Sequence, residues 1–181
     1  MRYHSIADIL SANEASHQRL LGTVAGISAS QEAFRPRDEQ WTIGDIVEHL
    51  SIVNHGFLRI TGKLLKEAEE AGTPAPAGLD LGSTALDAEG NQPPKFQAPE
   101  QVRPRGGQAL AGSLPRLQET LAGFRDLQPR LEAVDLSAPV FPHPAFGPLN
   151  AYQWMILLAE HQDRHRLQIE ALKATPEFPS I

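Results

Sequence analysis

Residues 41–50, "WTIGDIVEHL", begin a helix and place a histidine beside its apolar stripe. Thr42 can cap this helix, Asp45 three positions later completes a capping box, and Trp41 can pack back onto the first turns as a hydrophobic staple. The start of the helix is therefore well defined. His49 lies about two turns inside it, where a histidine is more often a core or rim residue than a metal ligand, unless further histidines converge on it.

Four segments of the chain show the apolar spacing of helices. They cover residues 5–28, residues 42 to about 71, residues 107 to about 131, and a stretch that follows a proline-rich segment and ends near Lys173. No run of β alternation appears. We therefore expect an all-α fold, and four long helices of this pattern fold most simply as a four-helix bundle. With 181 residues and 41% hydrophobic content, the chain suits a single domain over residues 1–181.

Two proline-containing places interrupt this pattern. Residues 73–105 hold six of the fifteen prolines and form an unusually long connection. This length allows the chain to cross the whole bundle, so that the two helices it joins need not be antiparallel neighbours. The same length also suits a lid or a substrate-facing loop, and the two interpretations are compatible. Pro115 lies either in the first turn of the third helix or at a kink within it.

Composition argues against several classes of function. A net charge of −6, with 16 Lys and Arg residues scattered along the chain, provides no basic surface for nucleic acid. No cysteine is present, which excludes disulfides, thiolate ligands and a cysteine nucleophile, so thiol chemistry would need an external thiol. The N-terminal sequence has no apolar core long enough for a signal peptide, and no stretch approaches the roughly 20 apolar residues of a membrane span. We expect a cytoplasmic protein with no membrane partner.

The fourth helix contains "EHQDRHRL", in which His161 and His165 stand four residues apart. Both side chains therefore leave one face of the helix and can converge on one ion. They continue the inward line that starts at Trp154, where an unpaired imidazole would be costly, and metal ligation would satisfy both. Gln162 rather than a glutamate follows the first histidine, so this pair is not the metalloprotease signature.

The depth of the histidines in the bundle provides an independent check. His49 lies about two turns from the start of its helix, and His165 lies about two turns from the end of its own. If the second and fourth helices pack as antiparallel neighbours, His49 and the pair on the fourth helix meet at one depth.

The remaining histidines are poorer candidates by the same geometry. His143 precedes the fourth helix and is expected more than roughly 20 Å from His161 along the axis. His55 lies about 240° around the helix from His49 and faces elsewhere. His17 falls on the inner side of the first helix, as a pocket residue or a hydrogen-bonded core residue. His4 is expected to be exposed.

Three stretches carry a family resemblance: "RPRDEQWTIGDIVEHL", "HPAFGPLNAYQWMILLAEH" and "HQDRHRLQI". They resemble the DinB/YfiT-like superfamily of bacterial four-helix-bundle metalloproteins, which is related to bacillithiol transferases, and the resemblance spans most of the chain outside residues 73–105. It implies an up-down-down-up bundle with a long crossover between the second and third helices, often as a homodimer. It also implies that His49, His161 and His165 bind a divalent metal, zinc or nickel, with water in open positions.

These features predict a metal-dependent enzyme that acts on a small electrophilic substrate. Three neutral imidazoles leave an ion its full charge and an open position, so that it can lower the pKa of a bound water or thiol. The resemblance favours transfer of a low-molecular-weight thiol over hydrolysis. Asp45, Glu160, Asp163 and Gln168 lie near enough for orientation or proton transfer, and none is assigned as a catalytic base. The alternative is a non-catalytic metal-binding stress-response protein or small-molecule-binding bundle.

Overall fold

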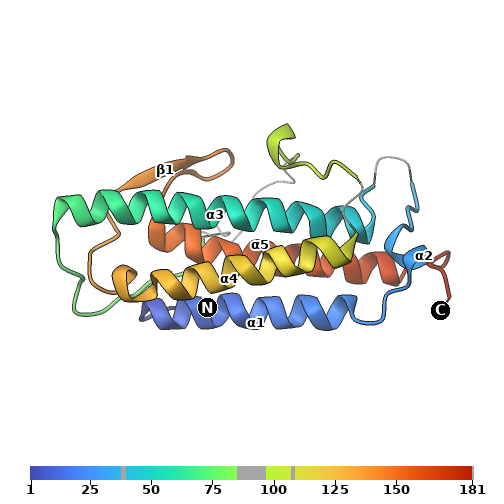
Figure 1. Ribbon diagram of the computed structural model, residues 1–181, viewed down its shortest axis with the longest axis horizontal. Helices are drawn as coiled ribbons and strands as arrows, with labels where there is room; N and C mark the ends of the chain where they lie inside the picture. The colour runs from blue at the N-terminus through green and yellow to red at the C-terminus, as the bar shows by residue number, and fades with distance from the viewer. Residues whose placement is uncertain (38–39, 85–96, 107–108, 181) are drawn as a thin grey trace.

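The computed structural model describes residues 1–37, 40–84, 97–106 and 109–180. Four long helices form a bundle, which confirms the expected architecture (Figure 1). They are α1 (Ile6–Val24), α3 (Ile43–Ala71), α4 (Leu110–Leu131) and α5 (Ala151–Lys173). A short helix, α2 (Ala29–Glu32), lies between α1 and α3, and the 3-10 helix η1 (Glu100–Val102) lies in the connection from α3 to α4. Among the described residues, no helix is long and apolar enough to span a membrane.

Between α4 and α5 the structure contains a small β element that the sequence pattern did not indicate. Here β1 (Val140–His143) and β2 (Gly147–Asn150) pair as an antiparallel hairpin. Pro142 and Pro148 stand opposite each other in this pairing, which hides the alternation normally used to recognise strands. Prolines are tolerated because each strand of a two-stranded hairpin has a free edge that needs no backbone donor.

Side-chain caps define the helix boundaries. The Thr42 hydroxyl accepts from Asp45 N at 3.0 Å and the Asp45 carboxylate accepts from Thr42 N at 3.0 Å, which is the predicted capping box of α3. Asn150 and Gln153 form an equivalent box at the start of α5. Helix α3 ends at Gly72, whose φ of +69° is the left-handed conformation that favours glycine.

Pro115 lies inside α4, which begins at Leu110, so its placement in the first turn is wrong. It cannot donate a backbone hydrogen bond to the preceding turn. The helix nevertheless continues to Leu131.

Contacts along the helices define their directions. Helices α1 and α5 run parallel, because Arg19 pairs with Asp163 and, further along both helices, Thr23 donates to Glu170 at 2.9 Å. Near the C-terminal ends of α3 and α4, Glu69 and Arg130 form an ion pair at 2.7 Å. Figure 1 shows α3 and α4 running together in the direction opposite to α1 and α5.

The connection from α3 to α4 therefore has to travel the length of the bundle. Its described parts pair with other segments of the chain. Leu81 forms an isolated antiparallel bridge with Tyr3, and Pro74 forms another with Val134. The 3-10 helix η1 packs against α3. Residues 85–96, within the segment 73–105 predicted to be irregular, lie outside the described residues.

Two apolar clusters fill the bundle, and polar side chains lie between them along α1, α3 and α5. Three of these side chains, which we call the polar layer, are Ser16 of α1, Asn54 of α3 and Gln162 of α5. Asn54 Nδ2 donates to Gln162 Oε1 at 2.9 Å, and Gln162 Nε2 donates to Ser16 Oγ at 3.1 Å. Because all three side chains are buried, these bonds fix the position of α5 along the bundle axis relative to α1 and α3. They thereby also fix the position of His161, which precedes Gln162 on α5.

Candidate metal centre

The structure brings together His49 of α3 and His161 and His165 of α5, which we call the histidine triad. One ligand nitrogen from each residue lies within 4.8 Å of the others, and His49 Nε2 lies 3.4 Å from His161 Nε2. The ring centroids of His161 and His165 are 4.5 Å apart, and those of His49 and His165 are 4.9 Å apart. The three histidines converge as their positions on the helices predict.

Hydrogen bonds orient two of the three rings. His49 Nδ1 donates to the Val102 carbonyl of η1 at 2.6 Å, and His165 Nδ1 donates to Gln168 Oε1 at 3.0 Å. Because both partners are oxygen acceptors, the ring protons sit on Nδ1 and the two Nε2 atoms keep their lone pairs. His161 Nδ1 is buried and has no hydrogen-bond partner among the described residues. Hydrogen bonds like those from His49 to Val102 and from His165 to Gln168 fix the tautomer of a metal-binding histidine.

Burial keeps the triad neutral. Burial first, and then the charge of His49, lowers the pKa of His165 to about 4, while the hydrogen bond with Gln168 opposes this change. The pKa of His161 lies well below its ordinary value because of burial and then the charges of His165 and His49. Burial also lowers the pKa of His49, although the bond to Val102 opposes it. Neutral imidazoles are the form that binds a metal, so the triad is competent at neutral pH.

Acidic side chains are engaged elsewhere. Asp45 remains at the cap of α3, Asp163 pairs with arginines, and Glu160 accepts from the Thr84 amide and hydroxyl at 3.2 Å and 3.0 Å. Of the four side chains considered for orientation or proton transfer, Gln168 is the one whose described hydrogen bond reaches a triad ring. The group of described side chains that could hold a metal ion therefore consists of three histidines and no carboxylate.

Aromatic rings pack around the triad. The Trp41 ring lies 4.8 Å from His49 and 6.2 Å from His165, measured between centroids. Phe57 lies 6.0 Å from His161. The staple predicted for Trp41 is compatible with its packing against the apolar cluster at the start of α3, but nothing in the sequence places its ring over two histidines. Phe57 follows His49 by about two turns, so helical spacing could have identified it.

The hairpin changes the position expected for His143. Its ring lies 5.3 Å from that of Trp154, and its Nδ1 accepts from the amides of Ala145 and Phe146 at 3.1 Å and 3.2 Å. Trp154 in turn lies 5.1 Å from Phe57, and Phe57 lies 6.0 Å from His161, so this series of ring contacts brings His143 near His161. The predicted separation of roughly 20 Å is therefore wrong, because the hairpin folds back along the bundle. His143 lies outside the group of described side chains that could hold a metal ion.

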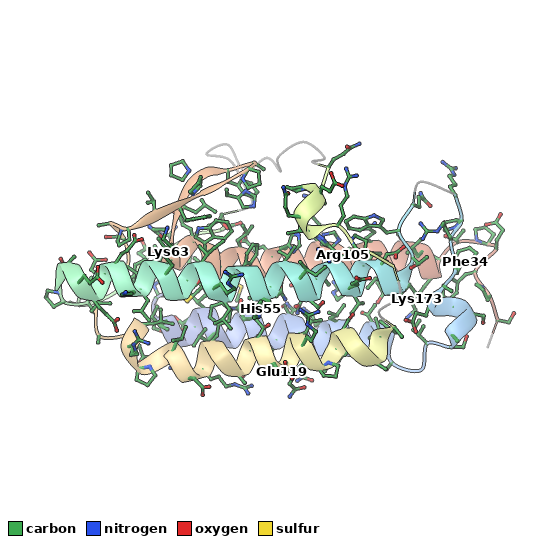
Figure 2. The ribbon with its side chains drawn as sticks, turned by 45° about the horizontal axis from the view of Figure 1, so that its top comes forward. Phe34, His55, Lys63, Arg105, Glu119 and Lys173 are labelled. Carbon is green, nitrogen blue, oxygen red and sulfur yellow. The ribbon has the colours of Figure 1, made fainter. Side chains whose placement is uncertain are left out.

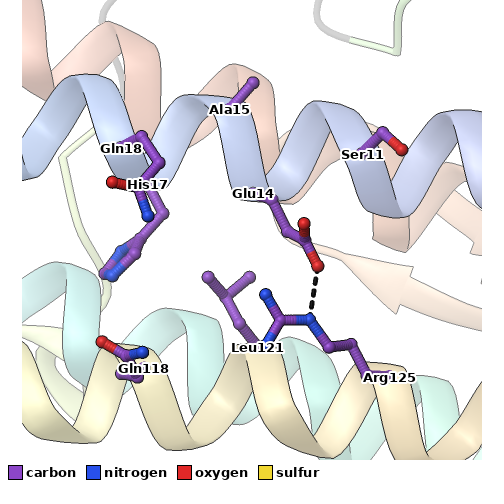
Figure 3. Close-up of a pocket in the computed structure, with 8 residues that line it drawn as sticks. All are labelled: Ser11, Glu14, Ala15, His17, Gln18, Gln118, Leu121 and Arg125. Atoms are coloured by element: carbon purple, nitrogen blue, oxygen red, sulfur yellow. Dashed lines mark hydrogen bonds and ion pairs between the residues drawn. The ribbon is translucent and has the colours of Figure 1, made fainter.

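The other histidines lie away from the triad. His55 is exposed on the outer face of α3 (Figure 2), and His4 is exposed before α1. His17 is buried and lines a pocket of about 300 Å³ between α1 and α4, with Gln118 and Arg125 on the facing helix (Figure 3). Neither ring nitrogen of His17 has a hydrogen-bond partner among the described residues, and the structure places the ring as a pocket residue.

Known proteins share this fold and sequence pattern. The crystal structure of TT2238, a four-helix bundle protein, aligns with a TM-score of 0.60 and 21% identity, covering 94% of this chain and 100% of that chain. The uncharacterized protein YuaE of Bacillus subtilis (strain 168) is 25% identical over 152 residues, which are 82% of this chain and 86% of that protein. The family model of the DinB superfamily matches residues 12–169, which include the whole histidine triad. The chain therefore belongs to the DinB superfamily.

Proposed function

We propose that this protein is a divalent-metal-dependent enzyme that holds zinc or nickel at the histidine triad and transfers a low-molecular-weight thiol to a small electrophilic substrate. The observation that supports the metal most directly is the approach of His49 Nε2 to within 3.4 Å of His161 Nε2. His49 Nε2 carries a lone pair, because the ring proton lies on Nδ1 and is donated to the Val102 carbonyl. A cation placed among the three rings would accept this lone pair and those of its neighbours.

The ligand set supports catalysis rather than a purely structural role. Structural zinc sites are closed by four protein ligands, whereas three histidines leave a position for water or substrate. A divalent ion bound there would supply Lewis acidity and lower the pKa of a water or thiol in the open position. The chain supplies the orientation: Val102 and Gln168 hold two of the rings, and Trp41 and Phe57 pack beside them.

The nucleophile has to come from outside the chain if the reaction uses a thiol. The sequence contains no cysteine, so a diffusible thiol would be a co-substrate. Membership of the DinB superfamily supports this part of the proposal, because the resemblance described in the sequence analysis relates that family to bacillithiol transferases. The same resemblance supports a homodimer as the assembly.

The test uses protein purified without a histidine tag. Its metal content is measured by mass spectrometry, and protein loaded with zinc or nickel is then incubated with glutathione or bacillithiol and an activated halide. We expect conjugation faster than the uncatalysed rate, and loss of this acceleration on chelation or in His161→Ala. His55→Ala, which changes an exposed histidine of α3, serves as the matched control and should retain the acceleration.

Three other outcomes would each change the assignment. Ester or amide hydrolysis that proceeds at full rate without a thiol would show a hydrolase. Stoichiometric metal with no acceleration of either reaction would favour the non-catalytic binding protein. Wild-type protein that binds neither zinc nor nickel would overturn the metal centre itself.

A further inference from the structure

The connection from α3 to α4 reaches the histidine triad through its backbone. Its 3-10 helix η1 lies beside α3 (Figure 1), and the Val102 side chain packs against the larger apolar cluster. The Val102 carbonyl accepts from His49 Nδ1 at 2.6 Å, and the Arg105 amide donates to Glu48 Oε1 at 3.1 Å. Two adjacent residues of α3 therefore hold the same stretch of the connection. We call residues 97–106 the clamp segment.

The bond to Glu48 is shielded from water. Glu48 is only 5% exposed, and a buried carboxylate is costly unless it is hydrogen-bonded. A backbone amide that donates to a carboxylate makes a stronger bond than one that donates to a neutral acceptor. Within the clamp segment, Arg103 Nε donates to the Ala98 carbonyl at 3.0 Å, which ties the two sides of η1 together. The bond from Arg105 therefore helps to hold Val102 in place.

We propose that the clamp segment and the histidine triad are thermodynamically coupled: closing the segment on α3 positions His49 for metal binding, and metal binding tightens the segment. This inference rests on the metal centre proposed above. A cation on Nε2 withdraws electron density from the imidazole and makes Nδ1–H a stronger donor to the Val102 carbonyl. In the other direction, the Val102 carbonyl holds the proton on Nδ1 and keeps Nε2 free for the ion.

Glu48 is then a positioning residue for the metal centre. It is not among the metal-ligating residues, and it acts through Arg105 and the clamp segment on the ring of its neighbour His49. Coupling between two binding events is reciprocal, so the factor by which the closed segment improves metal affinity equals the factor by which the metal favours closure.

Two variants of Glu48 separate positioning from simple loss of a buried side chain. Glu48→Ala removes the acceptor of the Arg105 amide, while Glu48→Gln keeps an amide oxygen that can accept the same bond. Asp80→Asn is the matched control, because Asp80 lies in the same connection and forms an exposed ion pair with Arg2. Zinc affinity is measured by competition with a chromophoric chelator. Exchange of the backbone amides of residues 97–106 is measured by mass spectrometry with and without zinc.

Zinc should slow amide exchange in the clamp segment of the wild type by about tenfold, which is the usual size of such couplings. Glu48→Ala should weaken zinc affinity by about tenfold and lose most of the protection, because outer partners of a metal ligand have effects of this order. Glu48→Gln should recover most of both properties, and Asp80→Asn should match the wild type in both.

Two results would overturn the coupling and leave the proposed function standing. One is zinc that binds the wild type without slowing exchange in residues 97–106. The other is folded Glu48→Ala that binds zinc as tightly as the wild type. If Glu48→Ala does not fold, Glu48→Gln and the wild type with and without zinc still decide the question. Wild-type protein that binds no zinc would instead overturn the metal centre, and the coupling with it.

Discussion

Acid should destabilise the metal-free protein through the histidine triad. The pKa of His165 falls from its ordinary 6.5 to about 4 in the folded chain, so between these pH values the unfolded state binds a proton that the folded state does not. The contribution of His165 to the free energy of unfolding is therefore complete above the unfolded pKa and is lost as the pH falls toward the folded pKa. At about 1.4 kcal/mol for each pH unit, this interval corresponds to about 3 kcal/mol from His165 alone. The lowered pKa values of His161 and His49 act in the same direction.

The assay is urea unfolding of chelator-treated protein between pH 7 and pH 4.5, followed by circular dichroism. His165→Leu removes one of the titrating groups, so the slope of unfolding free energy against pH should fall by about 1.4 kcal/mol per pH unit in this range. His55→Ala, an exposed control, should keep the wild-type slope. Equal slopes in His165→Leu and the wild type would refute the reasoning, because they would mean that His165 titrates normally in the folded protein.

Three further predictions concern the metal, the polar layer and one helix end. Alanine at any triad position should weaken zinc binding by more than about 100-fold, whereas His143→Ala should retain zinc, as measured by metal content after dialysis; equal content in all four variants would place the metal elsewhere. Asn54→Leu leaves Gln162 Oε1 buried without its donor and should reduce unfolding free energy by about 1–3 kcal/mol in urea, and an unchanged value would contradict this. Gly72→Ala introduces a side chain at φ +69° and should cost about 1 kcal/mol in thermal unfolding, unless the end of α3 rearranges.

Much of the fold was predictable because its signals are local. Thr42 and Asp45 form the predicted capping box, and Gly72 ends the helix that they begin. The helical period then fixes which side chains share a face, so the approach of His161 and His165 follows from their spacing of four residues. The contribution of His49 needed only one further condition, which is that α3 and α5 pack antiparallel at matching depth.

The remaining features of the fold and of the triad's surroundings depend on contacts that cannot be recognised from the pattern of side chains in the sequence. The Val102 carbonyl is a backbone group, and any residue at that position could offer it to His49. The ring of Trp41 reaches the triad only because the chain enters α3 at a particular angle. The hairpin was not recognised in the sequence because its strands are four residues long and contain prolines. Because the hairpin was not predicted, the position of His143 near His161 could not be predicted either.

The pairing of α1 with α5 sets the order in which the bundle is completed. Arg19 and Asp163 are 144 positions apart, so α1 meets this partner only after α3 and α4 have been synthesised. Helices made earlier present an open apolar face until α5 arrives, and such non-local closure slows folding relative to bundles of sequential hairpins. Two of the three triad histidines lie on α5. A metal bound at the triad would therefore require α5 to have joined the bundle, and it could not guide the earlier steps.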